Sequence, residues 1–261
     1  MDEVAGVTGG RGDGQADGRV EVHWVAVTPD NAAAAEAEAA RGVLDAEELR
    51  RAAVFRRAED RALYQVAHVA LRRLLGQRLD RAPGSVTFRR AACPGCGEPH
   101  GRPEQADAPG LEFSLSHASG LALIALAADP VGADVELAGA FEQGAAADVV
   151  TQLHPVERAE LAALAERAPD RWAAGALRCW VRKEAYLKGT GMGLGQGADQ
   201  DYVGLGPGFG TGPAASARPP AGWELRAIEV PPGFDAAIAL RLRPGSAGEA
   251  VRVRTAELRL A

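Results

Sequence analysis

The segment WVRKEAYLK, residues 180–188, decides how the rest of the chain is interpreted. Trp180, Glu184 and Lys188 recur every four residues, which places them on one face of a helix. A carboxylate and an ammonium group would therefore project side by side, just before the glycine-rich segment 189–195. The spacing fits an ordinary ion pair on a helix surface, and it fits two members of a functional site equally well.

Lysine is scarce in this chain, and both copies lie in this one segment. The chain has 29 basic side chains, of which Lys183 and Lys188 are lysines and all the others are arginines. A lysine ammonium is compact and its pKa can shift, whereas arginine carries a planar fork that keeps its proton. The bias indicates that arginine does not serve at these two positions, although chance can also place two lysines close together.

A second acidic pair lies in the segment VGADVEL, residues 131–137, which reads as a strand. Asp134 and Glu136 are two residues apart, so both carboxylates face the same side of the sheet. They repel each other, and neither finds a partner within the strand. The pair is either the solvent-facing side of an edge strand or a site for Mg²⁺, which binds carboxylates together with substrate phosphates.

The other periodic segments predict an α+β architecture. Asp45 with Glu48 predicts a capping box, and apolar residues then recur at helical spacing. Helices are expected over 47–55, 58–79, 145–153, 155–167 and 171–188, the last of them capped by Asp170. Strands are expected over 20–27, 85–89, 111–115, 120–127, 131–137, 223–230, 234–243 and 250–260. The alanine-rich segment after the first strand gives no clear pattern.

The turn at Asp129 and Pro130 is the expected boundary between two halves. Residues 19–129 and residues 130–261 each read as a strand, then helices, then further strands, which indicates a pseudo-repeat. Residues 1–18 are rich in glycine and aspartate and contain almost nothing to bury, so they predict a disordered tail.

Composition narrows the classes of function. The net charge of −6 argues against a general nucleic-acid binder, which needs a basic excess to neutralise phosphates. Apolar runs are too short to predict a membrane span, and the N-terminus lacks the features of a signal peptide. Three cysteines do not make a disulfide framework, so we expect a cytoplasmic protein.

Two local clusters allow more than one interpretation. Cys93, Cys96 and His100 are spaced like half of a zinc knuckle, but a closed structural site needs four ligands, and a reduced dithiol loop is the alternative. A nucleic-acid protein built on such a knuckle conflicts with the negative net charge. The two helices before residue 80 carry arginines that form either a solvated face or an anion site: Arg50, Arg51, Arg56, Arg57, Arg61, Arg72 and Arg73.

Taken in order, the motifs resemble those of the Sfp-type 4'-phosphopantetheinyl transferases. This family carries a G[I/V]D[I/V]E strand and, later in the chain, a WxxKEAxxK helix followed by GxGL. The corresponding segments here are GADVE at 132–136, WVRKEAYLK at 180–188 and GMGL at 191–194, with GRP at 101–103 and Ser116-His117 upstream. The resemblance extends from about residue 41 to the end of the chain.

The resemblance implies a pseudo-dimeric fold of two similar α+β halves with the active site between them. It implies an enzyme that transfers the 4'-phosphopantetheine arm of coenzyme A to a serine of an apo acyl or peptidyl carrier protein and releases 3',5'-ADP. Such enzymes commonly serve polyketide and nonribosomal peptide synthesis in secondary metabolism, and two fused halves suggest a monomer. The alternative is a module that binds coenzyme A or a carrier protein without catalysis.

The resemblance also implies roles for individual residues. Asp134, Glu136 and Glu184 would hold Mg²⁺. Glu184 would act as general base on the carrier serine, and Lys188 would stabilise charge on the pyrophosphate. Lys183 points away from the face of these two residues, so its role stays open. Coenzyme A would be contacted by Arg51, Arg72, Gly101, Arg102, Pro103, Ser116, His117 and Lys188.

Overall fold

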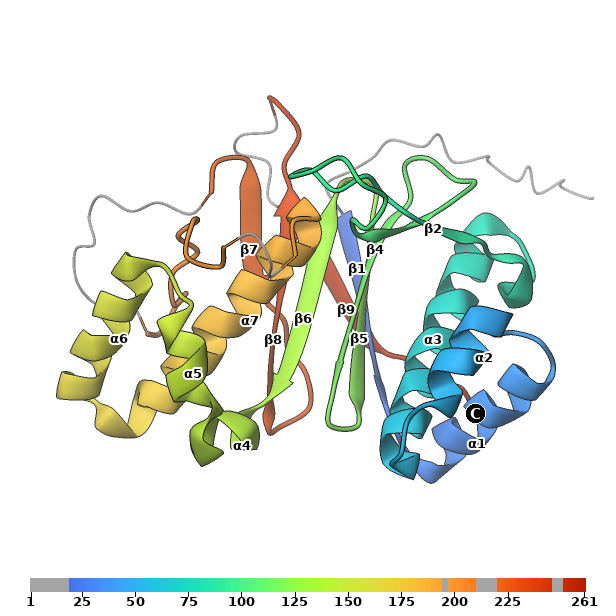
Figure 1. Cartoon of the computed structure of the whole chain (residues 1–261), viewed down its shortest axis with the longest axis horizontal. Coiled ribbons are helices and arrows are strands. Elements are labelled where there is room, and N and C mark those ends of the chain that lie inside the picture. Colours follow the sequence, from blue (N-terminus) through green and yellow to red (C-terminus); the bar gives the residue numbers. More distant parts are fainter. Residues whose placement is uncertain (1–18, 194–196, 210–219, 246–250) are drawn as a thin grey trace, which may run out of the picture.

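The computed structural model describes residues 19–193, 197–209, 220–245 and 251–261 (Figure 1). The predicted tail, residues 1–18, lies outside the described residues, as does Leu194 of the glycine-rich motif. The described chain forms helices and several sheets, so the predicted α+β class is confirmed. None of the described helices combines the length and the hydropathy that a membrane span requires.

The elements follow the predicted order closely. Up to residue 127 they are β1 (Arg19–Ala26), α1 (Pro29–Ala40), α2 (Ala46–Ala53), α3 (Ala58–Leu79), β2 (Phe88–Arg90), β3 (Pro103–Gln105), β4 (Glu112–Ala118) and β5 (Leu121–Ala127). The later elements are β6 (Val131–Leu137), α4 (Ala138–Ala140), α5 (Ala146–Thr151), α6 (Pro155–Arg167), α7 (Trp172–Thr190), β7 (Trp223–Ala227), β8 (Phe234–Arg241) and β9 (Arg252–Glu257).

Two sheets pack face to face between two groups of helices (Figure 1). The first sheet has the strand order β4-β5-β1-β9 and the second has the order β6-β8-β7, while β2 and β3 form a separate pair. Helices α1 and α3 pack on the outer face of the first sheet, and α5, α6 and α7 form one core with β8 of the second. The result is a four-layer arrangement whose two sheets share an apolar core.

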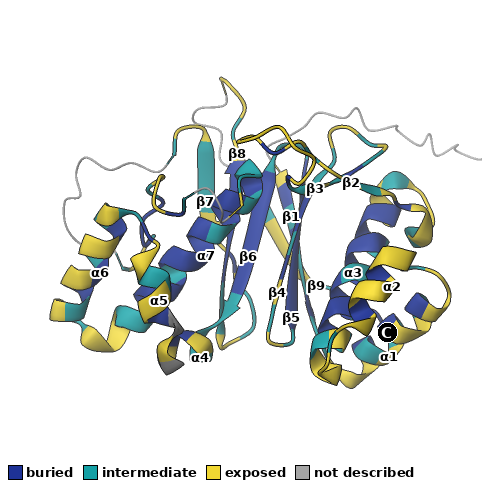
Figure 2. Ribbon diagram, in the orientation of Figure 1, coloured by how far each residue is buried: buried dark blue, intermediate teal, exposed yellow. Residues whose placement is uncertain are grey.

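Strand β5 shows how the layers explain the sequence. Ala122, Ile124 and Leu126 pack toward the first group of helices, whereas Leu121 and Leu123 face the second sheet. All of its residues are buried, because a strand between a helix layer and another sheet has no solvent face. Figure 2 shows the buried residues gathered in the two sheets and on the inner faces of α3 and α7.

The last strand crosses from the second half to the first sheet. β9 pairs in parallel with β1, from Arg252 opposite Arg19 to Glu257 opposite Trp24. The sequence places this strand in the C-terminal half, yet it completes the sheet of the N-terminal half. The predicted division into two halves near residue 129 therefore does not hold for β9. For the elements from β6 to β8 it stays a prediction.

Helix and strand ends agree only in part with the prediction. Asp45 and Glu48 form the expected capping box at α2. Asp170 does not cap α7, because it lies in the 3-10 turn Pro169–Arg171, which begins at a proline and precedes the helix. Arg171 takes the N-cap position instead. The alanine-rich segment without a pattern forms α1, capped by the side chain of Thr28. The strand expected from residue 85 begins only at Phe88.

Candidate active site

Helix α7 lies close against strand β6 because glycine occupies the point of contact. A Cβ on Gly132 would lie 1.8 Å from the carbonyl oxygen of Ala185 and 2.4 Å from the amide nitrogen of Gly189, so no side chain fits there. Asp134 follows on the same face of β6 and reaches Lys188 of α7. The glycine of the GADVE motif thus sets the distance between the acidic strand and the helix.

Three elements bring polar groups together around Asp134. The Nζ of Lys188 donates to Asp134 Oδ1 at 2.6 Å and to Ser116 Oγ of β4 at 2.9 Å. Ser116 Oγ donates to the same Asp134 oxygen at 2.8 Å. The other oxygen of Asp134, Oδ2, is buried and has no partner among the described residues. Such an unsatisfied buried acceptor is costly, which marks the position as one that a ligand can satisfy.

The three carboxyl groups of the site resist ionisation. Burial raises the pKa of Asp134, although the Lys188 ammonium opposes this shift. Burial, followed by repulsion from Asp134, raises the pKa of Glu136 to about 7, and the same two causes raise the pKa of Glu184 to about 7. A bound cation would favour the ionised form of all three groups.

The chemistry of these side chains fits a hard divalent cation. Mg²⁺ prefers oxygen ligands and usually takes one or two carboxylates, completing its shell with water and substrate phosphates. The three carboxylates do not form a closed cage: in the part of the chain that the structure describes, only Cys93, Cys96 and His100 gather three ligand atoms within 4.8 Å of one another. A Mg²⁺ ion held here would therefore take the rest of its ligands from water and substrate phosphates.

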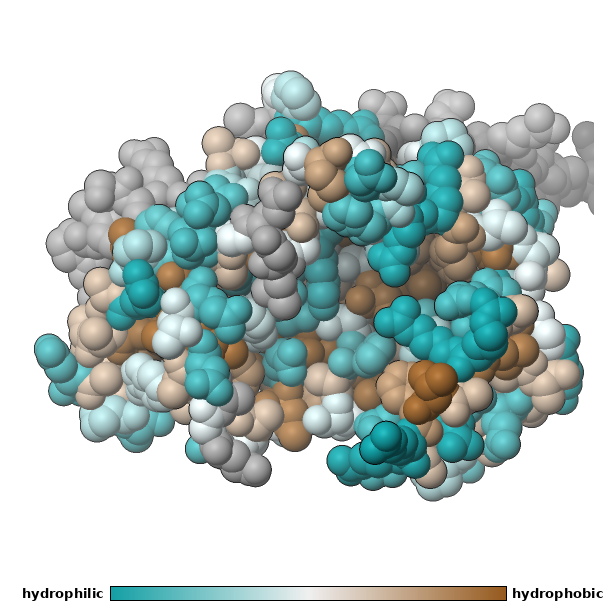
Figure 3. Space-filling model, viewed as in Figure 1, coloured by the Kyte–Doolittle hydropathy of each residue, from teal (hydrophilic) through white to brown (hydrophobic). Residues whose placement is uncertain are grey.

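The site opens into a cavity of about 1070 Å³ that residues of both halves line. Sites for small ligands typically measure roughly 300–1,000 Å³, so this cavity has room for a large ligand. Figure 3 shows a hollow near the centre of this face, between the two helical groups. The predicted site residues that line the cavity are Arg51, Gly101, Arg102, Pro103, Ser116, His117, Asp134, Glu136, Glu184 and Lys188.

Arg72 does not reach the cavity. Its side chain is 1 % exposed and forms ion pairs with Glu48 at 2.8 Å and with Asp45 at 2.9 Å. It also donates to the carbonyl oxygen of Val86 at 2.8 Å. The resemblance assigns Arg72 to coenzyme A, and we correct this assignment: the acids of the α2 capping box hold the guanidinium inside the first half.

Cationic groups of the first half also line the cavity. Arg51 and Arg90 line it from the first half, together with His117. The protein packed around the His117 ring lowers its pKa, and the charges of His68 and Lys188 lower it further, although the ring still meets water in the open cavity. The guanidinium groups suit a ligand with several phosphates, and the imidazole of His117 adds a ring that can hydrogen-bond.

The segment with Gly101 and Arg102 forms part of the cavity wall. A Cβ on Gly101 would lie 2.7 Å from the carbonyl oxygen of Ala91, so only glycine allows the two chain segments to approach. Arg102 pairs with Glu112 at 2.7 Å. Its Nη1 is a second buried group without a partner among the described residues.

Tyr64, His68 and Arg90 are among the residues of the cavity that the sequence did not single out. Tyr64 and His68 stack with ring centroids 4.0 Å apart, and His68 Nδ1 lies 3.1 Å from Glu48 Oε1. Their spacing of four residues on α3 is a signal that identifies such a pair. Arg90 lies in a three-residue strand and gives no signal of this kind.

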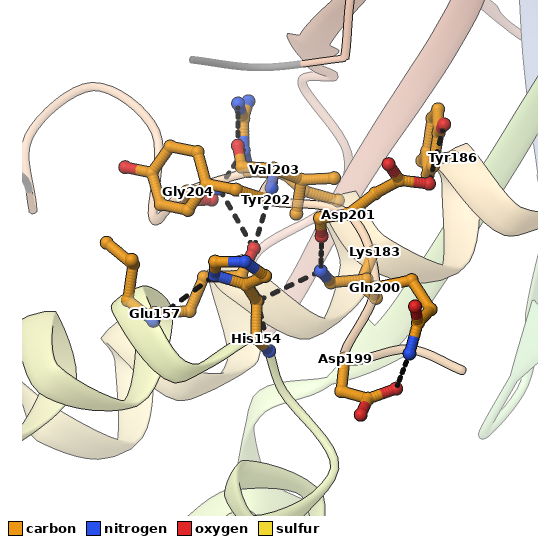
Figure 4. Close-up of polar contacts among 12 residues, drawn as sticks. His154, Glu157, Lys183, Tyr186, Asp199, Gln200, Asp201, Tyr202, Val203 and Gly204 are labelled. Carbon is orange, nitrogen blue, oxygen red and sulfur yellow. Dashed lines mark hydrogen bonds and ion pairs between the residues drawn. The ribbon is translucent and has the colours of Figure 1, made fainter. Parts of the chain in front are cut away.

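Lys183 lies on the other side of α7, in a closed cluster shown in Figure 4. Its side chain is fully buried and forms an ion pair with Glu157 of α6 at 3.0 Å. It also donates to the carbonyl oxygen of Asp201. Glu157 accepts from the backbone N–H groups of His154 at 3.0 Å and Val203 at 2.7 Å. Lys183 therefore joins α6, α7 and the segment after α7, away from the cavity.

Comparison with known proteins finds a family match for one part of the chain. Residues 130–239 match the family model of the 4'-phosphopantetheinyl transferase superfamily. The matched segment contains β6 and α7, and with them Asp134, Glu136, Glu184 and Lys188, but not the N-terminal half. A search of curated proteins finds no match to the chain.

Proposed function

We propose that the protein transfers the 4'-phosphopantetheine arm of coenzyme A to a serine of an apo acyl or peptidyl carrier protein and releases 3',5'-ADP. One observation carries the proposal: Asp134, Glu136, Glu184 and Lys188 meet in one large cavity, within the segment that matches the superfamily. Three carboxylates beside an ammonium group and a cationic lining suit a phosphoryl transfer, which depends mostly on positioning and electrostatics.

Glu184 is the proposed general base. A cation bound beside it would favour its ionised form, and the ionised carboxylate can accept the proton of the carrier serine. A general base in the right position contributes roughly 100- to 10,000-fold to a rate. The rigid helix α7 fixes its position beside Lys188, one turn further on.

Lys188 is the proposed group that stabilises charge on the leaving 3',5'-ADP. Its ammonium is held by Asp134 and Ser116, and its side chain is 32 % exposed and lines the cavity. Asp134, Glu136 and Glu184 would hold Mg²⁺, which when bound neutralises phosphate charge and orients the pyrophosphate.

The cationic lining is the proposed seat of the phosphates of coenzyme A. Arg51, Arg90 and Arg102 line the cavity, and guanidinium binds phosphate through paired hydrogen bonds. His117 adds a hydrogen-bonding ring near the carboxylates. The carrier serine would enter from the side of Glu184.

A mass measurement tests the proposal. The protein is incubated with coenzyme A, Mg²⁺ and apo carrier domains of polyketide and nonribosomal peptide synthases, and each carrier is then weighed. We expect a phosphopantetheine adduct on the carrier serine and release of 3',5'-ADP. Absence of the adduct from every carrier, together with intact coenzyme A binding, would support the rival function of a non-catalytic binding module.

The variant Glu184→Gln separates catalysis from binding. It keeps the shape of the side chain but cannot accept a proton, so we expect the transfer to be abolished while coenzyme A binding stays close to that of the wild type. Glu166→Gln on the exposed face of α6 is the matched control and should transfer normally. Full activity of Glu184→Gln would remove Glu184 from the role of base.

A further inference from the structure

A cluster of soft ligands lies at the wall of the same cavity, apart from the carboxylates. The ligand atoms of Cys93, Cys96 and His100 lie within 4.8 Å of one another, and Cys96 Sγ lies 3.0 Å from His100 Nε2. Both cysteines are free thiols. Cys93 is buried, whereas Cys96 and His100 are exposed. Three groups of this kind gathered on one short loop have the composition of a metal site.

The backbone of the loop is folded tightly around Cys93. The amide of Gly97 donates to the carbonyl oxygen of Cys93 at 2.8 Å, and the amide of Cys93 donates to the carbonyl oxygen of Glu98 at 2.8 Å. Gly97 has φ +80°, a conformation that favours glycine. The N–H groups of Cys96 and Gly95 face the Cys93 sulfur. N–H groups in this position stabilise the negative charge of a thiolate ligand.

We propose that Cys93, Cys96 and His100 bind one zinc ion, with water as the fourth ligand. Thiolate and imidazole are the ligands that zinc prefers, and three protein ligands with one open position form a recognised type of zinc site. Mg²⁺ prefers oxygen ligands, so the carboxylates and the Cys93–His100 loop would select different cations. Zinc binding would displace the protons of the two thiols.

The position of the loop indicates what the zinc ion would do. The loop leads directly into Gly101 and Arg102, which form part of the cavity wall. A Cβ on Gly191, the residue that ends α7, would lie 3.7 Å from side-chain atoms of Pro94 and Arg102. The loop therefore leaves the first half and contacts the end of the helix that carries Lys188. A zinc ion would fix this bridge and with it the position of Arg102.

Metal content is the decisive measurement. The full-length protein is expressed with added zinc, freed of loosely bound ions by gel filtration and measured by elemental mass spectrometry. We expect about one zinc per chain, and little zinc in Cys96→Ser and in His100→Ala, whose side chains are exposed and whose loss should leave the fold intact. Cys179→Ala, a buried cysteine of α7, is the control and should keep its zinc.

Three results would overturn the proposal. Wild-type protein without zinc after this treatment would do so, as would variants that keep the full amount. An intact mass lower by two hydrogens, which denotes a disulfide between Cys93 and Cys96, would show the loop to be a redox pair instead. Replacement by Co²⁺ provides a second readout, because a thiolate-to-cobalt absorption band should appear in the wild type and disappear in Cys96→Ser.

The readout is independent of the proposed function, because metal content does not require transfer. If zinc is bound and no carrier is modified, the site stands and the transferase proposal fails. If a protein without zinc modifies the carrier, the transferase proposal stands and the zinc site fails. When both stand, removal of zinc by a chelator should increase hydrogen exchange over residues 93–103 and weaken coenzyme A binding more than it lowers the maximal rate.

Discussion

The two lysines of α7 lie in opposite environments. Lys183 is fully buried against Glu157, whereas Lys188 is 32 % exposed and reaches Asp134 at the edge of the cavity. They are five residues apart, which turns their side chains by about 140° around the helix. One helix thus contributes to a closed polar cluster on one side and to an open site on the other.

The partners of the two lysines explain the difference. Both oxygens of Glu157 accept hydrogen bonds from backbone amides or lie against Lys183, so nothing is left for a ligand. Asp134 has one oxygen on Lys188 and one buried oxygen without a partner among the described residues. The lesson is that a satisfied buried ion pair indicates structure, whereas an incomplete one at a cavity indicates function.

Replacing Lys183 should give the largest effect. Lys183→Met leaves the Glu157 carboxylate buried without its cation, and removing one partner of a buried pair costs about 3–5 kcal/mol of stability. We expect urea unfolding to show a loss of this size in the free energy of unfolding. At a temperature where the variant stays folded, the transfer rate should change little, because Lys183 lies away from the cavity.

A double variant sharpens this prediction. Glu157→Gln combined with Lys183→Met removes both charges. The losses in free energy of unfolding of the two single variants should therefore sum to clearly more than the loss of the double variant. If the single and double variants show additive losses, the two residues do not act as a pair. A transfer rate that falls in folded Lys183→Met would end the contrast between the two lysines.

The sequence predicted the features that depend on neighbours along one element. The helical face of Glu184 and Lys188 and the strand face of Asp134 and Glu136 follow from spacing alone, and the structure brings these four residues to one cavity. The resemblance to a known family then assigned the strand 132–136 and the helix 180–188 to one active site. That they meet depends on Gly132, whose small size lets α7 approach β6.

The sequence could not predict features that depend on distant partners. From the sequence, Arg72 belongs to a group of arginines that could bind an anion. In the structure, the Arg72 guanidinium on α3 forms an ion pair with Glu48 on α2. The role of Lys183 depends on Glu157, which lies on another helix. The same limit explains why nothing in the sequence indicated that β9 pairs with β1, since the two strands lie more than 200 residues apart.

Replacing Lys188 should give the next largest effect, and on rate rather than stability. Lys188→Met removes the cation that would stabilise the leaving group, and loss of one such group lowers a rate by roughly 100- to 1,000-fold. Lys188→Arg should also be impaired, because a planar guanidinium cannot occupy the point 2.6 Å from Asp134 and 2.9 Å from Ser116 that the ammonium takes. Initial transfer rates with saturating coenzyme A measure both.

The arginine variant is the sharper test of the lysine bias. If Lys188→Arg transfers as fast as the wild type, the concentration of both lysines in α7 has no functional meaning at this position. Arg178→Lys, on the same helix and paired with Asp235 at 2.7 Å, is a control for a general effect of exchanging the two cations. It should transfer at close to the normal rate.

The smallest effect is expected from neutralising Glu136. Its pKa is 4.5 in an unfolded chain and about 7 in the folded protein, because burial and Asp134 disfavour its charge. Between these values the folded state binds more protons, so its contribution to stability declines as pH rises from 4.5 to 7. Glu136→Gln abolishes this decline and should be more stable than the wild type at pH 8 without Mg²⁺, by on the order of 1 kcal/mol because the group is partly exposed.

Added Mg²⁺ distinguishes a metal site from simple crowding of acids. Mg²⁺ should raise the unfolding temperature of the wild type at pH 8, where the carboxylates are ionised, and should have less effect on Glu136→Gln. Glu229→Gln, an exposed carboxylate of the second half, should respond to Mg²⁺ like the wild type. Equal responses in all three proteins would mean that the acidic strand binds no Mg²⁺ through Glu136. The unsatisfied oxygen of Asp134 would then need another partner, and the contrast with Glu157 would have to be explained without a cation.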